Sequence, residues 1–330
     1  MKILITGITG FVGSYLAEYI LNLKERHEIY GICRWRSPKD NLVNIYNKIT
    51  LFDSDLCDLS ALIRTINNVK PDIIFHLAAQ SYVQASFNAP IQTLWSNVIG
   101  TANLLEAVRI TEIDPVIHIC SSSEVYGQVS EKDLPIKETC PFKPASPYAV
   151  SKVGEDMLAL QYWLSYKTKT IRTRMFTHTG PRRGDVFAMS FFAKQVAAAE
   201  LNLKSPVISV GNLNSVRTFC DVRDAVKAYW IMVHKCNPGE VYNIGGNRTM
   251  TIGEALDILL SLSRKKFEIK ADPRLLRPSD VTLQIPCIDK FKNETGWIPE
   301  IPLEETLKDI LEYWRQELSR CPWKAISIIK

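Results

Sequence analysis

A short apolar segment followed by regularly spaced glycines opens the chain and constrains its fold more than any other feature. Residues 2–6 read Lys-Ile-Leu-Ile-Thr, which is typical of a buried strand. Gly7, Gly10 and Gly13 come next, and a helical pattern covers residues 14–23. Glycines in this arrangement permit a tight turn and let a pyrophosphate approach the helix N-terminus. The segment therefore predicts a dinucleotide-binding unit rather than a plain turn.

Strand and helix patterns alternate through the first half of the chain. We predict strands at 28–33, 49–53, 72–79, 116–120 and 170–175, and helices at 58–68, 90–110 and 146–166. Short apolar runs separated by helical stretches are typical of parallel strands with crossover helices. The alternation predicts an α/β fold with a doubly wound parallel sheet.

Beyond residue 176 the alternation is less regular. We predict helices at 187–201, 222–234, 252–263 and 303–317, and strands at 207–210 and 240–244. This favours a cofactor-binding domain over residues 1–175, which would also hold the catalytic residues. Residues 176–330 would form a smaller α/β lobe, mainly for substrate. We expect the strand at 240–244 to return to the edge of the main sheet.

A serine-proline pair at 146–147 marks the start of a helix that carries a tyrosine and a lysine. Serine is a favoured N-cap and proline a favoured first helical residue, so Tyr148 and Lys152 share one helix face. The ammonium and the positive end of the helix both favour the phenolate. Tyr148 could then take a hydroxyl proton while a hydride leaves the same carbon. The spacing alone also fits a chance pair on a solvated face, but the N-terminal glycines favour the catalytic interpretation.

Two polar residues follow the predicted strand at 116–120. Ser122 is placed to hold the substrate hydroxyl, and Glu124 supplies a carboxylate. Glu124 is interpreted either as a base or as a structural carboxylate that accepts backbone N–H bonds at the strand end. Both interpretations remain open from the sequence.

The end of the second predicted strand carries Arg34 and Arg36 where an NAD-selective site would place an acid. Two guanidinium groups can pair with a 2′-phosphate, so the sequence favours NADP. The alternative is that both are solvated surface charges. Asp55 and Leu56 follow the third predicted strand, where the adenine would lie, and the small residues of 77–79 permit close approach to a cofactor. In that same strand we interpret His76 as a core histidine rather than a base.

Composition and charge exclude several classes of protein. The net charge of +5 over 330 residues does not indicate a nucleic-acid partner. The eight cysteines include no Cys-x-x-Cys pair, which indicates reduced thiols in the cytoplasm rather than disulfides or a zinc site. We expect no signal peptide, because a strand begins at once, and no membrane span.

Taken together, Thr6-Gly7-x-Thr9-Gly10-x-x-Gly13, Ser122 and Tyr148-x-x-x-Lys152 resemble the extended short-chain dehydrogenase/reductase superfamily over essentially the whole chain. The segment 122–127 is similar to Thr-Ser-Glu-Leu-Tyr-Gly of GDP-mannose 4,6-dehydratases. Residues 181–184 and 277–281 are similar to two further dehydratase motifs. By contrast, residues 192–195 and 210–224 look closer to GDP-6-deoxy-4-keto-hexose reductases, and Thr177 stands where both groups usually carry Asn.

The resemblance implies a Rossmann-type sheet with a smaller lobe, NADP as cofactor, a GDP-sugar substrate and a homodimer or homotetramer in the cytoplasm. Its catalytic set maps to Ser122, Glu124, Tyr148 and Lys152. Cofactor contacts are implied for Gly7, Thr9, Gly10, Phe11, Val12, Gly13, Arg34, Arg36, Asp55, Leu56, Leu77, Ala78, Ala79, Tyr148, Lys152, His178 and Arg183. Substrate contacts are implied for Ser81, Val83, Ser123, Glu124, Thr177, Lys194, Val210, Gly211, Arg217, Arg277 and Asp280. No metal is implied.

The expected activity is that of an NADP-dependent GDP-mannose 4,6-dehydratase, a lyase of deoxysugar biosynthesis. The alternatives are a GDP-4-keto-6-deoxy-mannose reductase, which would form GDP-rhamnose, another nucleotide-sugar epimerase or dehydratase, and a non-catalytic NADP-binding scaffold. Arg217 and Arg277 are candidates for the substrate diphosphate, because two phosphates in a cleft need paired cations. Surface ion pairs with Asp221 and Asp280 are the alternative for these arginines.

Overall fold

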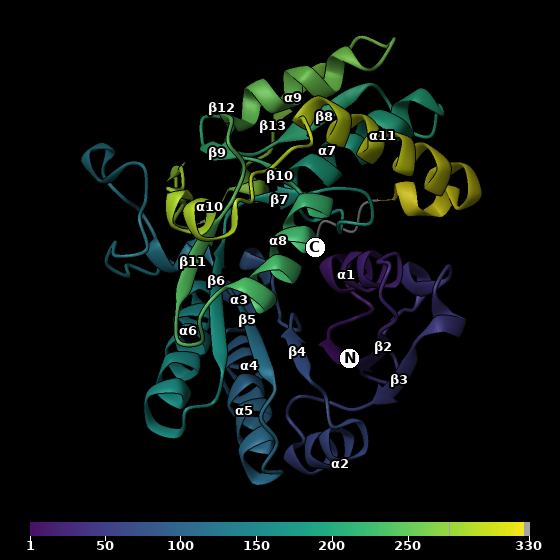
Figure 1. Cartoon of the computed structure of the whole chain (residues 1–330). Coiled ribbons are helices and arrows are strands. Elements are labelled where there is room, and N and C mark those ends of the chain that lie inside the picture. The colour runs from purple at the N-terminus through teal and green to yellow at the C-terminus, as the bar shows by residue number, and fades with distance from the viewer. Residues whose placement is uncertain (277, 327–330) are drawn as a thin grey trace.

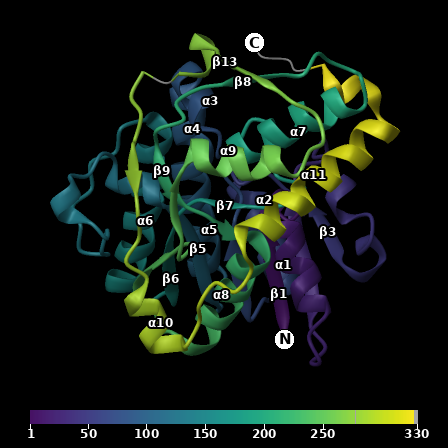
Figure 2. The same cartoon turned by 90° about the horizontal axis from the view of Figure 1, so that it is seen from above.

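The computed structural model describes residues 1–276 and 278–326. Within these residues the central element is a seven-stranded sheet of order β11-β6-β5-β4-β1-β2-β3 (Figures 1 and 2). All neighbouring strands in it run parallel. The strands are β1 (Lys2–Thr6), β2 (Glu28–Cys33), β3 (Thr50–Asp53), β4 (Ile73–His76), β5 (Val116–Ser122), β6 (Thr170–Met175) and β11 (Val241–Ile244). The predicted doubly wound α/β sheet is confirmed.

The strand order reverses direction at β1. The chain places β2 and β3 on one side of β1, and β4, β5 and β6 on the other. A reversal of this kind leaves a crevice at the carboxyl ends of the strands, where ligands bind in doubly wound sheets. The glycine turn follows β1 and Ser122 ends β5, so both lie at this edge.

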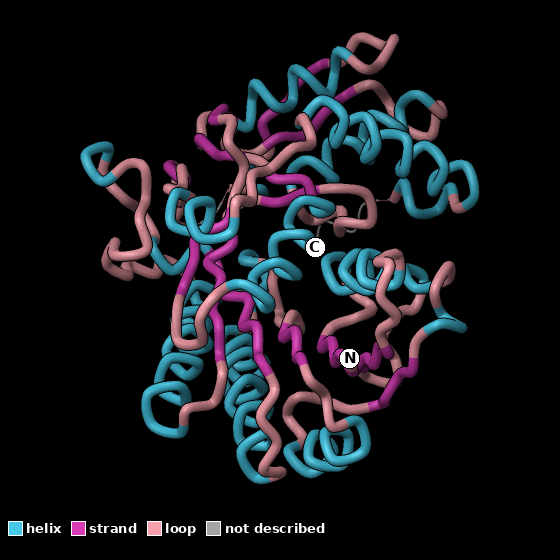
Figure 3. The backbone as a smooth tube through the Cα atoms, in the orientation of Figure 1, coloured by secondary structure: helices cyan, strands magenta, loops and turns pink. Residues whose placement is uncertain are grey.

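Helices cover both faces of the sheet (Figure 3). On one face, α1 (Phe11–Leu21) and α8 (Val222–Lys235) pack in one hydrophobic core. On the other, α2 (Leu59–Val69), α5 (Gly100–Ile110) and α6 (Pro147–Tyr166) contribute to a second. A sheet covered on both faces needs apolar side chains at successive strand positions, which explains the unbroken apolar runs of the sequence.

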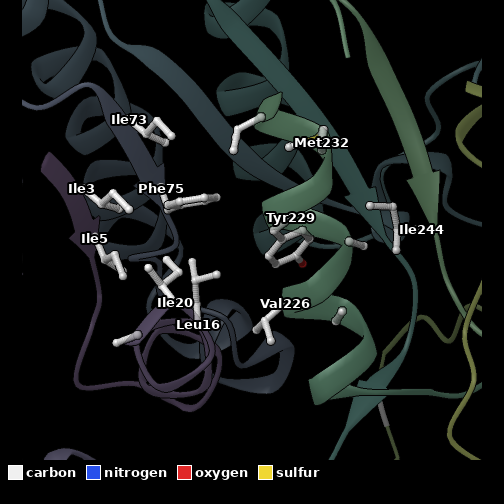
Figure 4. Close-up of a cluster of buried hydrophobic side chains, with 14 of the residues drawn as sticks. Ile3, Ile5, Leu16, Ile20, Ile73, Phe75, Val226, Tyr229, Met232 and Ile244 are labelled. Carbon is white, nitrogen blue, oxygen red and sulfur yellow. The ribbon is translucent and has the colours of Figure 1, made fainter. Parts of the chain in front are cut away.

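Strand β1 shows how the two cores divide its side chains. Ile3 and Ile5 belong to the core that includes α1 and α8, whereas Leu4 belongs to the opposite one. Figure 4 shows Ile3, Ile5 and Phe75 on the same side as Tyr229 of α8. Successive strand residues point to opposite faces, so this alternation follows directly from strand geometry.

A smaller lobe has its own hydrophobic core, formed around three helices. These are α7 (Ala188–Glu200), α9 (Ile252–Ser261) and α11 (Leu303–Arg320). Its short strands are β8 (Val207–Val210) with β13 (Glu268–Ala271), and β9 (Val216–Thr218) with β12 (Thr249–Thr251) and β14 (Leu283–Gln284). A further pair joins β7 (His178–Thr179) to β10 (Cys220–Asp221), and α10 (Asp289–Thr295) packs beside β11. The predicted strand near 240–244 is β11, which pairs with β6 at the sheet edge. The division of the chain at residues 175 and 176 stays a prediction.

The helix predicted over residues 90–110 consists of three parts rather than one regular helix. It contains α4 (Pro90–Leu94), a π-helical turn (Trp95–Ile99) and α5, and α3 (Val83–Asn88) precedes it. The wider turn contains Asn97, whose side chain donates to Ser151 Oγ on α6 at 2.9 Å and bonds the backbone of Gln80. The irregular turn therefore joins the end of β4 to the catalytic helix.

Six short 3₁₀ turns complete the description, at Asp40–Leu42, Tyr46–Lys48, Ser123–Tyr126, Glu131–Asp133, Pro273–Leu275 and Pro322–Ala325. Over residues 1–276 and 278–326, no helix has the length and apolar character needed to cross a bilayer.

Candidate active site

The glycine turn brings the end of β4 against the start of α1. Gly7 has a left-handed φ of +69°, and a Cβ there would lie 2.9 Å from the backbone of Ala78. A Cβ on Gly13 would lie 2.4 Å from the Gly7 carbonyl oxygen. Both positions thus require glycine, and α1 begins at Phe11, directly after Gly10. No side chain caps this helix start, so its N–H groups suit a pyrophosphate, which fits a dinucleotide.

Thr6, the last residue of β1, links this turn to the segment that follows β4 through hydrogen bonds. Its hydroxyl accepts hydrogen bonds from the N–H groups of Leu77 and Ala78, both at 3.1 Å. It also bonds His76 Nδ1 at 2.9 Å, and His76 Nε2 bonds the Thr101 hydroxyl at the same distance. Burial lowers the pKa of His76 to about 3, so this residue is a neutral core histidine, as predicted.

The predicted NADP-selecting arginines follow β2 and are exposed. The Arg36 guanidinium stacks on Trp35, 4.4 Å from the ring centroid. In the described part of the chain, neither Arg34 nor Arg36 forms an ion pair with a carboxylate. Asp55 accepts from the Cys57 N–H at 2.9 Å, and Leu56 packs against Gly100 beside it. The arginines are therefore available to an anionic ligand.

The catalytic helix starts as predicted. The Ser146 hydroxyl accepts from the Ala149 N–H at 3.1 Å, and Pro147 is the first helical residue. Tyr148 and Lys152 are buried, and the Lys152 ammonium lies 6.0 Å from the centroid of the Tyr148 ring. It donates to the Cys120 carbonyl oxygen of β5 at 2.9 Å. The structure therefore brings both side chains to the carboxyl end of β5.

The pKa of Tyr148 depends on its burial as well as on its charged neighbours. Burial raises the pKa of Tyr148, whereas Lys152 and a hydrogen bond from Ser122 lower it, and the net shift is upward. Burial also acts to lower the pKa of Lys152, but Glu155 and Tyr148 raise it above its ordinary value. Local charges favour the phenolate, as expected, but desolvation of the helix face outweighs them.

Glu124 lies beside this group in the 3₁₀ turn Ser123–Tyr126. Its Oε1 accepts from Gln284 Nε2 at 3.3 Å, and the Gln284 oxygen accepts from the Ser123 hydroxyl at 3.1 Å. Its own N–H donates to the Ser122 hydroxyl at 3.2 Å. Among the described residues the carboxylate thus bonds a side-chain amide, not the backbone N–H groups of the structural interpretation. Sequence reasoning missed Gln284, which comes from β14, 160 positions away.

Two predicted cofactor residues come from the segment after β6. The His178 ring stacks on Phe11 with centroids 5.9 Å apart, and its Nε2 lies 3.4 Å from Arg183. Burial and Arg183 lower the pKa of His178 to about 3. Arg182 lies along α1, where it donates to Ser14 Oγ at 3.3 Å and pairs with Glu18 at 2.9 Å, whereas the Arg183 guanidinium lies 5.3 Å from the centroid of the Phe11 ring.

The predicted substrate residues lie partly in the lobe. Arg217 is buried on β9 and donates to the carbonyl oxygens of Val216, at 2.9 Å, and Val281. This burial contradicts a surface pairing, and the proposed partner Asp221 binds Arg223 and Thr306. Lys194 is buried and pairs with Asp185 at 2.6 Å.

The remaining predicted substrate residues are spread over several loops and strand ends. Asp280 accepts from Asn212 at 2.7 Å, and Arg277 lies outside the described residues. Val210 ends β8, with Gly211 packed against Leu275. Ser81 is exposed and Val83 buried at the start of α3, and Thr177 follows β6 with its carbonyl oxygen bonded to the Cys220 N–H at 2.9 Å. In the described residues no cluster of three or more His, Cys, Asp or Glu side chains could hold a metal ion.

A parallel sheet with a glycine turn after β1, and a serine, a tyrosine and a lysine meeting at the end of β5, defines an enzyme of the extended short-chain dehydrogenase/reductase class. The sequence profile described as "GDP-mannose 4,6 dehydratase" matches residues 4–310. The chain therefore belongs to the GDP-mannose 4,6-dehydratase family.

Relatives of two activities resemble the chain to a similar degree. A GDP-6-deoxy-D-mannose reductase of Pseudomonas aeruginosa is 31% identical over 318 residues, covering 96% of this chain and 98% of that protein. A GDP-mannose 4,6-dehydratase of Yersinia enterocolitica is 33% identical over 351 residues, covering 94% and 92%. Among solved structures, RMD from Pseudomonas aeruginosa complexed with NADPH has a TM-score of 0.83 at 29% identity, covering 96% of this chain and 99% of that one.

Proposed function

We propose that the protein is an NADP-dependent GDP-mannose 4,6-dehydratase that forms GDP-4-keto-6-deoxy-mannose. The observation that carries this proposal is Glu124, a carboxylate held by Gln284 beside Ser122 and Tyr148. A dehydratase needs a base at C5 in addition to the group that works at C4, and we assign this second role to Glu124.

Each catalytic residue acts at a particular carbon of the sugar. Ser122 holds the C4 hydroxyl, and Tyr148 takes its proton while the C4 hydrogen leaves as hydride. Bound NADP would accept this hydride and later return it to C6. The C4 ketone acidifies the C5 proton, which the Glu124 carboxylate removes and passes to the C6 hydroxyl as this group leaves as water. A proton added at C5 when the hydride returns would balance the one that Tyr148 took from the C4 hydroxyl. A positioned carboxylate of this kind contributes roughly 10²–10⁴-fold to a rate.

The cofactor assignment rests on two observations. Gly7 and Gly13 let the turn pack closely against Ala78 and against its own backbone, where a Cβ would clash, and the start of α1 that follows has no side-chain cap. Arg34 and Arg36 lie exposed past the end of β2, where a 2′-phosphate would be met. The Pseudomonas aeruginosa structure with NADPH supports the same choice.

We assign the diphosphate of the GDP-sugar to Arg217 together with Arg277. A dianionic group in an enclosed cleft is favoured by buried guanidinium groups, and Arg217 is buried at the lobe side of the crevice. The names of the relatives support a GDP-sugar as substrate.

Two helices carry exposed apolar stripes that suit a homodimer or homotetramer. Ile91 and Trp95 on one helix are 74% and 57% exposed and lie four positions apart. On α6, Val150, Met157 and Leu164 recur every seven positions and are also exposed. α4 and α6 contact each other, so the two stripes lie on neighbouring helices (Figure 1). Size-exclusion chromatography of a Leu164→Glu variant, which should elute as a smaller species, tests this assignment.

All eight cysteines are free thiols, which supports the cytoplasm as the compartment of the protein.

The second candidate is the reductase, which would use Tyr148 to donate a proton at C4 while NADPH is consumed. The comparison supports it to a similar degree, because a reductase is 31% identical over 318 residues and a dehydratase 33% identical over 351.

One experiment separates the two. Incubation of the protein with GDP-mannose and no added cofactor should yield a 4-keto-6-deoxy product, detected by mass. If GDP-mannose stays intact while NADPH is oxidised in the presence of the 4-keto-6-deoxy sugar nucleotide, the protein is the reductase. If neither substrate changes, the scaffold alternative is favoured.

A further inference from the structure

The ammonium of Lys152 is hydrogen-bonded to a buried carboxylate on the same helix. Glu155 is three positions further along α6, and its side chain is 1% exposed. Its Oε2 accepts a hydrogen bond from Lys152 Nζ at 2.9 Å. Over residues 1–276 and 278–326, its Oε1 has no hydrogen-bond donor. The carboxylate therefore has one strong partner, and that partner belongs to the catalytic group.

The neighbouring acid on the same helix serves a different purpose. Asp156 is bound by Arg172 at 3.0 Å and by Arg174 at 2.8 Å, so β6 neutralises it. Asp156 thus fixes α6 against the sheet without involving Lys152. The charge of Glu155 instead acts on the ammonium and, through it, on Tyr148.

The other titratable groups around this pair are neutral near pH 7. Burial raises the pKa of the Cys120 thiol and of the Tyr229 phenol, and lowers that of His118 to about 3. Arg183 is the exception: burial lowers its pKa to about 10, so it is still a cation near pH 7, and it interacts electrostatically with Tyr148. Of the side chains bonded to Lys152, Glu155 is therefore the one that can carry negative charge.

We propose that Glu155 is a positioning residue for Lys152 and that its carboxylate moderates the effect of the Lys152 charge on Tyr148. This rests on the proposed role of Tyr148 in proton transfer at C4. Ionised Glu155 balances the ammonium and makes the phenolate less favourable. Protonated Glu155 leaves the ammonium charge free to favour the phenolate.

The ionisation of Glu155 falls in the range where the enzyme would work. Burial raises the pKa of Glu155 to about 7, although Lys152 lowers it. Above this pH the carboxylate raises the pKa of Tyr148, and below it that effect is lost. The Glu155→Gln variant should therefore resemble the protonated form at every pH.

The test is the pH–rate profile of the NADP-loaded enzyme. In Glu155→Gln, the part of the profile that depends on Tyr148 should move to lower pH by roughly one to two units, as expected for loss of a unit charge about 6–12 Å away at an effective dielectric of about 20. The direction is the same whether the reaction is dehydration or reduction, so failure of the dehydratase assignment does not conceal it. An unmoved profile, or one moved to higher pH, overturns the proposal.

Three further measurements keep the test decisive. The control variant is Glu106→Gln. Glu106 pairs with Arg109, three positions away on another helix, and its removal should leave the pH–rate profile unmoved.

If Glu155→Gln fails to fold in a thermal scan, the wild-type profile itself decides, because coupled ionisation requires a transition broader than that of a single proton. If neither substrate turns over, the tyrosinate absorbance present in the wild type and absent in Tyr148→Phe should still titrate at lower pH in Glu155→Gln. An identical titration in both proteins counts against the proposal.

Discussion

The two sides of the crevice are built in different ways. The cofactor side comes from contiguous segments, the turn from Gly7 to Gly13 and the helix that begins at Pro147, each placed by its own strand. The lobe side draws its polar groups from loops and short strands such as β9 and β14. One side is thus determined locally, and the other only by tertiary packing. They meet where Gln284 bonds Glu124 at 3.3 Å.

The largest expected effect is on the local side. Tyr148→Phe keeps the buried ring but removes the proton donor and acceptor at C4. We expect turnover to fall by roughly 10²–10⁴-fold, with hydride transfer and dehydration both lost. Product mass and nicotinamide absorbance report the two steps. Residual activity within tenfold of the wild type would remove Tyr148 from the chemistry.

Glu124→Gln should separate the two steps. The amide keeps the size of the side chain but cannot remove the C5 proton. Bound NADP should still be reduced on mixing with GDP-mannose, while the 4-keto-6-deoxy product falls by roughly 10²–10⁴-fold. Dehydration at the wild-type rate would return Glu124 to a structural role and favour the reductase.

The cofactor side can be tested through its arginines. Arg34→Ala with Arg36→Ala should weaken NADP binding by several kcal/mol, if each charged contact is worth about 1.5–3 kcal/mol. Binding of NAD, which has no 2′-phosphate, should change little. Titration of both cofactors against wild type and variant measures this, and equal wild-type affinity for the two would contradict the NADP assignment.

The smallest expected effect lies at the junction of the two sides. Gln284→Leu removes the amide that holds Glu124, and we expect dehydration to fall about tenfold, the size of one hydrogen bond to a charged group. NADP reduction on mixing should persist. The matched control is Gln128→Leu, since Gln128 bonds Thr282 at 2.8 Å beside the same strand without touching Glu124. An equal loss in both variants would mean that lobe packing, not Glu124, is what Gln284 supports.

This contrast also explains what could be predicted from the sequence. The strands of the parallel sheet, the glycine turn and the Ser146 cap depend on residues near each other in the chain, and all were predictable. Gln284 was not, because a residue 160 positions away meets Glu124 only after the lobe has folded. The net upward pKa shift of Tyr148 was not predictable for a related reason, although the effect of Lys152 has the predicted direction. The lysine is visible in the spacing, but the depth of burial is a property of the packed structure.

Strand β11 has a consequence for how the chain reaches this structure. The outer edge of β6 pairs with a strand that the chain supplies only after α7, β8 and α8. Until Ile244 has been synthesised, that edge presents unpaired N–H and C=O groups, the kind of template on which other chains add. The core drawn in Figure 4 also needs Tyr229 and Met232 of α8, which the chain supplies shortly before β11. A nascent chain that stops after β6 is therefore an aggregation-prone intermediate, and efficient folding depends on late residues arriving before neighbouring chains do.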